Sequence, residues 1–197
     1  MHPFIYLASQ SPRRSQLLEQ LDVKHTLLLP TADEDAEALE AVLPDEEPHI
    51  YVQRVTSLKL QAALARLKHR HLAEAPVLCA DTTVALDGVI CGKPVNTADA
   101  ERMLRMLSGR THDVYTAIAI GFENHQLTAC STSKVSFSTL SDQDINSYIT
   151  SGEPMGKAGA YAVQGRAAAF ISRIEGSYTG IMGLPLFETA NLLRQLR

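Results

Sequence analysis

The 197 residues (21.5 kDa) match the size of one α/β domain, and 45% apolar with 20% charged residues leaves no compositional case for disorder. We expect residues 1–197 to form a single domain. A net charge of −4 excludes the broad positive field that binds nucleic-acid backbones, so no nucleic-acid partner is expected. No apolar run reaches the roughly 20 residues of a membrane span, and the first residues lack a signal-peptide pattern, which predicts a cytoplasmic protein without a membrane partner.

The first part of the chain predicts a strand, a turn, a helix and a second strand. Residues 4–8 form a short apolar run, and Ser11 and Pro12 are typical of a helix cap and a first helical position. Residues 22–29 lead into the second strand. Eight of the residues 33–47 are carboxylates, which predicts a solvated loop or short exposed helix that can donate one or two metal ligands.

The middle of the chain predicts a long helix and then a buried strand. Apolar residues at helical spacing indicate a helix over 48–68, with Lys59 beside its apolar stripe. The buried-strand pattern of 77–80 continues into Asp81, and Asp87 with Gly88 is a strong signal for a two-residue hairpin. Asn96 or Thr97 can cap the next helix, which ends at 108–109.

The remaining chain predicts a long antiparallel hairpin followed by shorter elements. Residues 111–122 and 127–137 pair in the hairpin, Ser141 caps a short helix, 167–174 form a strand, and Pro185 starts a C-terminal helix. The expected fold is mixed α/β, with a long twisted sheet, helices outside it, two lobes and a cleft.

The first chemical signal is the run SQSPRR at residues 9–14. Here a predicted strand delivers two guanidinium groups to a helix N-terminus, where unpaired N–H groups and partial positive charge favour phosphate. A capped surface helix with two solvated arginines has the same pattern. The run therefore predicts a phosphate-binding site, and an ordinary surface helix is the alternative.

Asp81 is the second candidate, because a carboxylate at the end of a buried strand can bind a divalent ion or orient a water molecule. A turn or capping aspartate is the alternative. Lys93 in a Gly-Lys-Pro turn and Lys157 in a glycine-rich loop add candidate phosphate contacts.

Other enzyme classes find little support in the sequence. A Ser/His/Asp hydrolase could use Ser108 and His112, but the chain lacks a G-x-S-x-G elbow, and we expect His112 to be structural and hydrogen-bonded near a sheet edge. Neither a P-loop nor a dinucleotide fingerprint occurs. Three cysteines without a CxxC spacing predict buried, reduced thiols.

Six ordered motifs resemble the Maf family of nucleoside triphosphate pyrophosphatases, over nearly the whole chain. They are Ser9-Gln10-Ser11-Pro12-Arg13-Arg14, Lys59, Ala80-Asp81-Thr82, Gly92-Lys93-Pro94, Leu107-Ser108-Gly109-Arg110-Thr111-His112, and Lys157-Ala158-Gly159-Ala160-Tyr161 with Gln164-Gly165.

The resemblance implies a fold related to the inosine triphosphatase-like enzymes, commonly a homodimer, and hydrolysis between the α and β phosphates with Mg²⁺, Mn²⁺ or a similar divalent metal ion. It implies that Asp81 is the catalytic base and a metal ligand, and that Glu34 is the second metal ligand. The residues implied to hold the polyphosphate of the nucleoside triphosphate are Ser9, Arg13, Arg14, Lys59 and Lys93.

The resemblance also bears on which nucleobase the substrate carries. Positions matching Arg13, Thr82 and Gln164 distinguish relatives that act on dTTP and UTP from those that prefer 7-methyl-GTP, and this chain resembles the first group. Gly156 departs from the family, since many relatives have aspartate there, which predicts an altered metal demand or rate. A non-catalytic sensor of nucleotides that regulates cell division remains an alternative to the enzyme.

Overall fold

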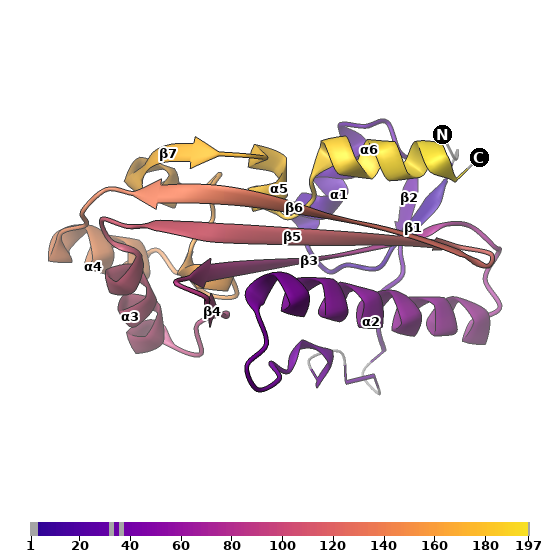
Figure 1. The fold of residues 1–197 in the computed structure, drawn as a ribbon, viewed down its shortest axis with the longest axis horizontal. Coiled ribbons are helices and arrows are strands. Elements are labelled where there is room, and N and C mark those ends of the chain that lie inside the picture. Colours follow the sequence, from indigo (N-terminus) through magenta and orange to yellow (C-terminus); the bar gives the residue numbers. More distant parts are fainter. Residues whose placement is uncertain (1–3, 32–33, 36–37, 197) are drawn as a thin grey trace.

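The computed structural model describes residues 4–31, 34–35 and 38–196, and in this part of the chain seven strands form one mixed sheet (Figure 1). The strand order is β2-β1-β3-β5-β6-β7, with β4 paired to β3. β1 is parallel to β2 and β3, and the other pairs are antiparallel. The strands are β1 (Ile5–Leu7), β2 (His25–Leu27), β3 (Val77–Leu86), β4 (Val89–Cys91), β5 (Thr111–Phe122), β6 (His125–Phe137) and β7 (Ile171–Glu175).

Helices cover both faces of this sheet. In Figure 1 the long helix α2 lies below the strands, α1 and α6 lie above them, and α3 and α4 lie at the far end. The α-helices are α1 (Pro12–Glu19), α2 (Pro48–His69), α3 (Thr97–Leu107), α4 (Asp142–Thr150), α5 (Tyr178–Met182) and α6 (Leu186–Gln195). Three 3₁₀ turns are η1 (Ala38–Glu40), η2 (Ala158–Ala160) and η3 (Arg166–Phe170). Among the described residues, no helix combines the length and the apolar character that crossing a membrane requires.

The side chains of β3 alternate between the two faces of the sheet, and this alternation decides which helices they pack against. Val77 and Cys79 pack in one cluster with Leu60 of α2, whereas Leu78 and Ala80 pack in another with residues of α1 and α6. Successive side chains of a strand point to opposite faces. Asp81 therefore faces α2, and Thr82 faces the α1 side.

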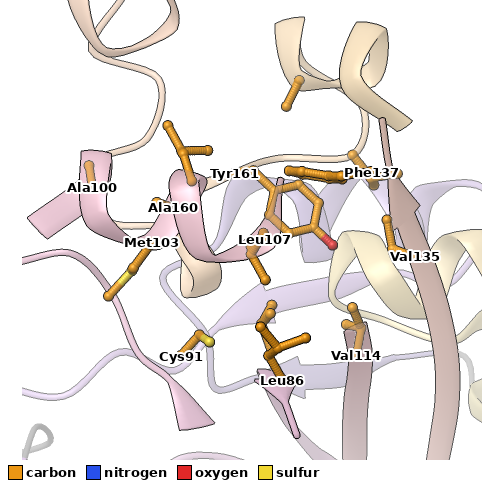
Figure 2. Packing of buried hydrophobic residues seen from close by; sticks show 14 of the residues in the cluster. Leu86, Cys91, Ala100, Met103, Leu107, Val114, Val135, Phe137, Ala160 and Tyr161 are labelled. Atoms are coloured by element: carbon orange, nitrogen blue, oxygen red, sulfur yellow. The ribbon is translucent and has the colours of Figure 1, made fainter. Parts of the chain in front are cut away.

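The other end of the sheet has a core of its own. There Val84 and Val114 pack with α3, α4 and the segment after η2, and Figure 2 shows Tyr161 and Phe137 in this cluster. The two rings lie 5.0 Å apart in an edge-to-face arrangement. Gly159 has φ +67, and an added Cβ would lie 2.8 Å from Cγ1 of Val84, so only glycine fits this close contact.

A gap in strand pairing separates the two cores along one edge of β3. β1 pairs only with Val77 and Leu78, and β4 pairs with β3 only from Val84 onward. On this side, residues 79–83 have no strand partner in the described part of the chain. Three residues of this stretch, Ala80, Asp81 and Thr82, line the hollow that the gap leaves.

The predicted mixed α/β fold is confirmed, and most elements lie close to the predicted positions. The two-residue hairpin is present, with φ 50 at Asp87 and φ 79 at Gly88, as the turn requires. Asn96 caps α3 by accepting from the N–H of Asp99, and Ser141 forms a capping box with Asp144. The three cysteines are free thiols, but only Cys79 and Cys91 are buried as expected, and Cys130 is partly exposed.

Three local expectations were wrong, and one helix was not predicted. Ser11 stands at the N-cap of α1 but makes no side-chain cap bond. The strand expected over 167–174 begins only at Ile171, because Arg166–Phe170 forms η3. α5 was not predicted, since its five residues carry no helical period of apolar positions. His112 is buried on β5, which lies between β3 and β6 rather than at a sheet edge.

Candidate active site

A cavity of about 480 Å³ occupies the gap beside β3. It lies at the carboxyl end of β1, where open α/β sheets commonly bind ligands. Seven of the predicted site residues line it, and they come from four separate segments: Ser9, Arg13, Arg14, Lys59, Asp81, Thr82 and Lys93. Two others, Glu34 and Gln164, are not part of the described lining.

The two arginines of α1 reach the cavity from its N-terminus and are held by the end of α5. Nε of Arg14 donates to the carbonyl of Gly183 at 2.8 Å, and Nε of Arg13 donates to that of Met182 at 3.4 Å. These carbonyls stand where α5 ends, and the left-handed φ of +118 at Gly183 stops the helix there. A helix end with free carbonyls favours cations, so it orients both guanidinium groups.

Arg14 also joins the turn to β3. It donates to Oγ of Ser9 at 3.0 Å and to Oγ1 of Thr82 at 3.4 Å, and Thr116 donates to the same Thr82 oxygen at 3.0 Å. Burial lowers the pKa of Arg14, and nearby Asp81 opposes this. Burial likewise lowers the pKa of Arg13. Both guanidinium groups are thus partly desolvated, which strengthens their electrostatic attraction for an anion.

Lysines and carboxylates alternate on the α2 side of the cavity. Nζ of Lys59 donates to Oδ1 of Asp81 at 2.6 Å and to Oε1 of Glu40 at 2.7 Å. Nζ of Lys93 donates to the other oxygen of Glu40 at 2.9 Å. Asp81 is only 9% exposed, so its pairing with Lys59 occurs in a partly desolvated place.

Glu40 is a cavity residue that sequence reasoning missed. Burial raises its pKa, but Lys59 and Lys93 outweigh burial and hold the pKa of this carboxyl below its usual value. The Tyr51 hydroxyl donates to the Glu40 carbonyl at 2.9 Å and fixes the backbone of η1. The acidic run predicted that some carboxylate would reach the site, but only tertiary contacts select Glu40 from eight candidates.

Glu34 has another partner. Nε of Arg66 donates to both of its carboxylate oxygens, at 2.9 and 3.0 Å, and this pairing with Arg66 lowers the pKa of Glu34 to about 2. Arg66 itself lines the cavity, a residue that sequence reasoning did not single out. The described residues contain no group of three or more His, Cys, Asp or Glu that could hold a metal ion.

The far wall of the cavity is more apolar. Tyr161, Val163 and Val114 line it, whereas the side chain of neighbouring Gln164 is exposed. The Tyr161 hydroxyl hydrogen-bonds with Nε2 of His112 at 2.8 Å inside the core. His112 is therefore structural, as expected from the sequence. Lys157 reaches the lining from its loop, and its Nζ donates to the Met155 carbonyl at 3.2 Å.

This arrangement suits a compact, multiply charged anion. Six cationic side chains line the cavity, and the carboxylate of Asp81 is available to orient or deprotonate a water molecule. A chain of phosphates beside an apolar wall would match the distribution of charge.

Comparison with known proteins supports this interpretation. The sequence profile of the family described as Maf-like protein matches residues 4–196. A protein of Albidiferax ferrireducens named dTTP/UTP pyrophosphatase is 66% identical over 194 residues, which is 98% of this chain and 97% of that protein. One of the same name from Cupriavidus pinatubonensis is 58% identical over 197 residues, covering 100% of this chain and 98% of that protein.

Among solved structures, the Staphylococcus aureus Ham1 protein is similar to 68% of this chain, over 71% of its own, with a TM-score of 0.43 and 15% identity. The family assignment rests on the sequence match and on the near-complete coverage of both relatives. The chain belongs to the family of Maf-like proteins.

Proposed function

We propose that this protein hydrolyses dTTP and UTP to the nucleoside monophosphate and pyrophosphate. Two relatives named dTTP/UTP pyrophosphatase are 66% and 58% identical to this chain, and the matches cover 97% and 98% of their lengths. The observation that carries the proposal is that Arg13, Arg14, Lys59 and Lys93 line the same cavity as Asp81.

The cationic residues would hold the triphosphate chain. Arg14 has a guanidinium whose orientation is set by the Gly183 carbonyl and by the hydroxyls of Ser9 and Thr82, so little ordering is needed when an anion binds. A guanidinium matches two phosphate oxygens at once, and a lysine ammonium acts as a point charge. The nucleoside would then extend toward the more apolar wall.

Asp81 would act on the attacking water. Its carboxylate takes a proton as the water oxygen bonds to the α-phosphorus, and the bond from that phosphorus to the bridging oxygen breaks. Pyrophosphate leaves with the bonding electrons, and the arginines and lysines stabilise its growing charge.

The residues present fit a divalent metal ion of the magnesium type. Asp81 already faces a cation, the ammonium of Lys59 at 2.6 Å, and magnesium uses one or two carboxylates together with substrate phosphates and water. When bound, such an ion would neutralise phosphate charge next to the carboxylate. Asp81 would hold it, and a role for Glu34 as second ligand stays a prediction, since Glu34 is paired with Arg66.

Recognition of the pyrimidine stays a prediction as well. Thr82 lines the cavity but its hydroxyl oxygen is shared by Arg14 and Thr116, and Gln164 is exposed. An amide can both donate and accept, as a pyrimidine edge requires. Gln164 would need to turn inward to make that contact.

A substrate panel tests the proposal. Pyrophosphate release is measured for dTTP, UTP, CTP and 7-methyl-GTP, with Mg²⁺ and with EDTA, using Asp113→Asn as a matched control. Asp113 is also a strand aspartate paired with a lysine, Lys134, but it is outside the cavity lining. We expect dTTP and UTP to be hydrolysed in Mg²⁺ by the wild type and by this control.

Two outcomes would contradict the proposal. Preference for 7-methyl-GTP would assign the protein to the other substrate group. Tight binding of triphosphates with no release of pyrophosphate in any metal would make it a nucleotide sensor.

A further inference from the structure

The carboxylate of Glu40 lies between two lysines of the cavity in the way a bound anion would. Its two oxygens accept separately from Lys59 and from Lys93, at 2.7 and 2.9 Å. A carboxylate and a phosphate offer a lysine the same kind of charge-assisted hydrogen bond. Glu40 thus occupies a two-lysine anion site with a group of the protein itself.

The local charge balance leaves little attraction for a second anion at this place. Lys59 and Lys93 contribute two positive charges, and Asp81 and Glu40 contribute two negative ones. A phosphate that approached both lysines would stand next to the Glu40 carboxylate at hydrogen-bond distances, where like charges repel strongly in a partly desolvated site.

The backbone on either side of Glu40 is fixed, so the side chain is the part that can move. The Tyr51 hydroxyl holds the Glu40 carbonyl, and Arg54 holds the Ala41 carbonyl at 2.8 Å while pairing with Glu46. The Glu40 side chain is 28% exposed and can rotate toward solvent without unfolding η1.

We propose that Glu40 is a built-in competitor of the substrate's phosphates: its carboxylate holds Lys59 and Lys93 in the free protein and must leave before a polyphosphate can bind both lysines. The inference rests on the proposed function and adds a regulatory contact to the same cavity. Because the binding-competent form is then only a fraction of the free protein, the apparent affinity falls by that fraction. The same competition promotes release of pyrophosphate after hydrolysis.

Removal of the competing charge tests this inference. In Glu40→Gln the shape is retained and the charge is lost, and we expect inorganic tripolyphosphate and pyrophosphate to bind about 10-fold to 100-fold more tightly, the range of one charged hydrogen-bond pair. Binding is measured by isothermal titration calorimetry in EDTA at fixed ionic strength. In Mg²⁺, the variant should also show a lower KM and stronger inhibition by pyrophosphate.

Glu47→Gln is the matched control. It removes the same charge seven residues away, where the carboxylate faces His49 and is 72% exposed. We expect this variant to change the affinity for tripolyphosphate by no more than about twofold, since exposed charges are well screened.

Equal tightening in both variants would overturn the inference, because the effect would then be one of net charge. Weaker binding in Glu40→Gln, with metal or without it, would also overturn it and make Glu40 a ligand for metal or substrate. The EDTA titration involves no hydrolysis, so it separates the two proposals. If Glu40→Gln binds tripolyphosphate no more tightly than the wild type, and the wild type hydrolyses dTTP, only the competition by Glu40 is refuted. If Glu40→Gln binds tripolyphosphate more tightly, but the wild type hydrolyses no triphosphate, only the proposed hydrolysis is refuted.

Discussion

The two sides of the cavity are built in different ways. On the side of α1, Arg14 is fixed by three partners: a helix-end carbonyl, Ser9 and Thr82. On the opposite side, Lys93 stands on a turn with its side chain 55% exposed, and Glu40 is its one ion-pair partner among the described residues. One side is therefore preorganised for an anion, whereas the lysines of the other side are paired with carboxylates. On the competition proposed above, these lysines have to be released before they can bind phosphate.

Asp81 stands on the α2 side, paired with Lys59, and its loss should have the largest effect. In Asp81→Asn we expect kcat for dTTP to fall by about 10²- to 10³-fold, because one preorganised group of an active site typically contributes that much. The melting temperature should stay near that of the wild type. Asp113→Asn serves as the control, and near-normal dTTP turnover in Asp81→Asn would refute the role of Asp81.

The second prediction concerns His112, which is buried behind the apolar wall of the cavity and hydrogen-bonded to Tyr161. It is 2% exposed, its Nδ1 has no hydrogen-bond partner among the described residues, and burial lowers its pKa to about 4. Between pH 6.5 and pH 4 only the unfolded chain binds this proton. The free energy of unfolding therefore decreases as the pH is lowered through this range, by roughly 3 kcal/mol in total. Above pH 6.5 the group has no effect.

Urea unfolding from pH 7 to pH 4 measures this dependence. In His112→Gln the slope of unfolding free energy against pH should become shallower over that window, although the variant is less stable at pH 7. An unchanged slope would show that other groups govern the acid sensitivity.

Arg14 and Lys93 form a matched pair for the comparison itself. Arg14→Met should lower kcat/KM by about 10-fold to 100-fold and reduce the melting temperature, because it leaves the Gly183 carbonyl without its donor. Lys93→Met should raise KM by about fivefold or less and leave the melting temperature unchanged, as for an exposed ion pair. Equal effects from both variants would abolish the distinction between a fixed and an adaptable side.

Elements with strong local signals were predictable from the sequence. Pro12 at a helix start, Asp87-Gly88 in a hairpin and the alternation along β5 each determine structure within a few residues. The cationic side of the site could be predicted for the same reason, because Arg13 and Arg14 follow directly on a buried strand.

Residues chosen by contacts distant in sequence could not be predicted. Glu40 rather than Glu34 lines the cavity because Arg66, 32 residues further along the chain, pairs with Glu34, while Lys59 and Lys93 pair with Glu40. α5 was missed, although its last carbonyls orient both arginines. The homodimer implied by the family resemblance stays a prediction that sedimentation velocity can test.

The short length of β1 has a further consequence for solubility. Because β1 stops at Leu7 and β4 begins opposite Val84, residues 79–83 of β3 keep one edge without a strand partner in the described part of the chain, and open edges invite pairing with a strand of another molecule. Inward-pointing charges are a known protection against such pairing, and Asp81 with Lys59 supplies them at this edge. The same ion pair that prepares the protein for a ligand would thus discourage self-association while the cavity is empty, and neutral replacements at both positions should aggregate sooner on heating.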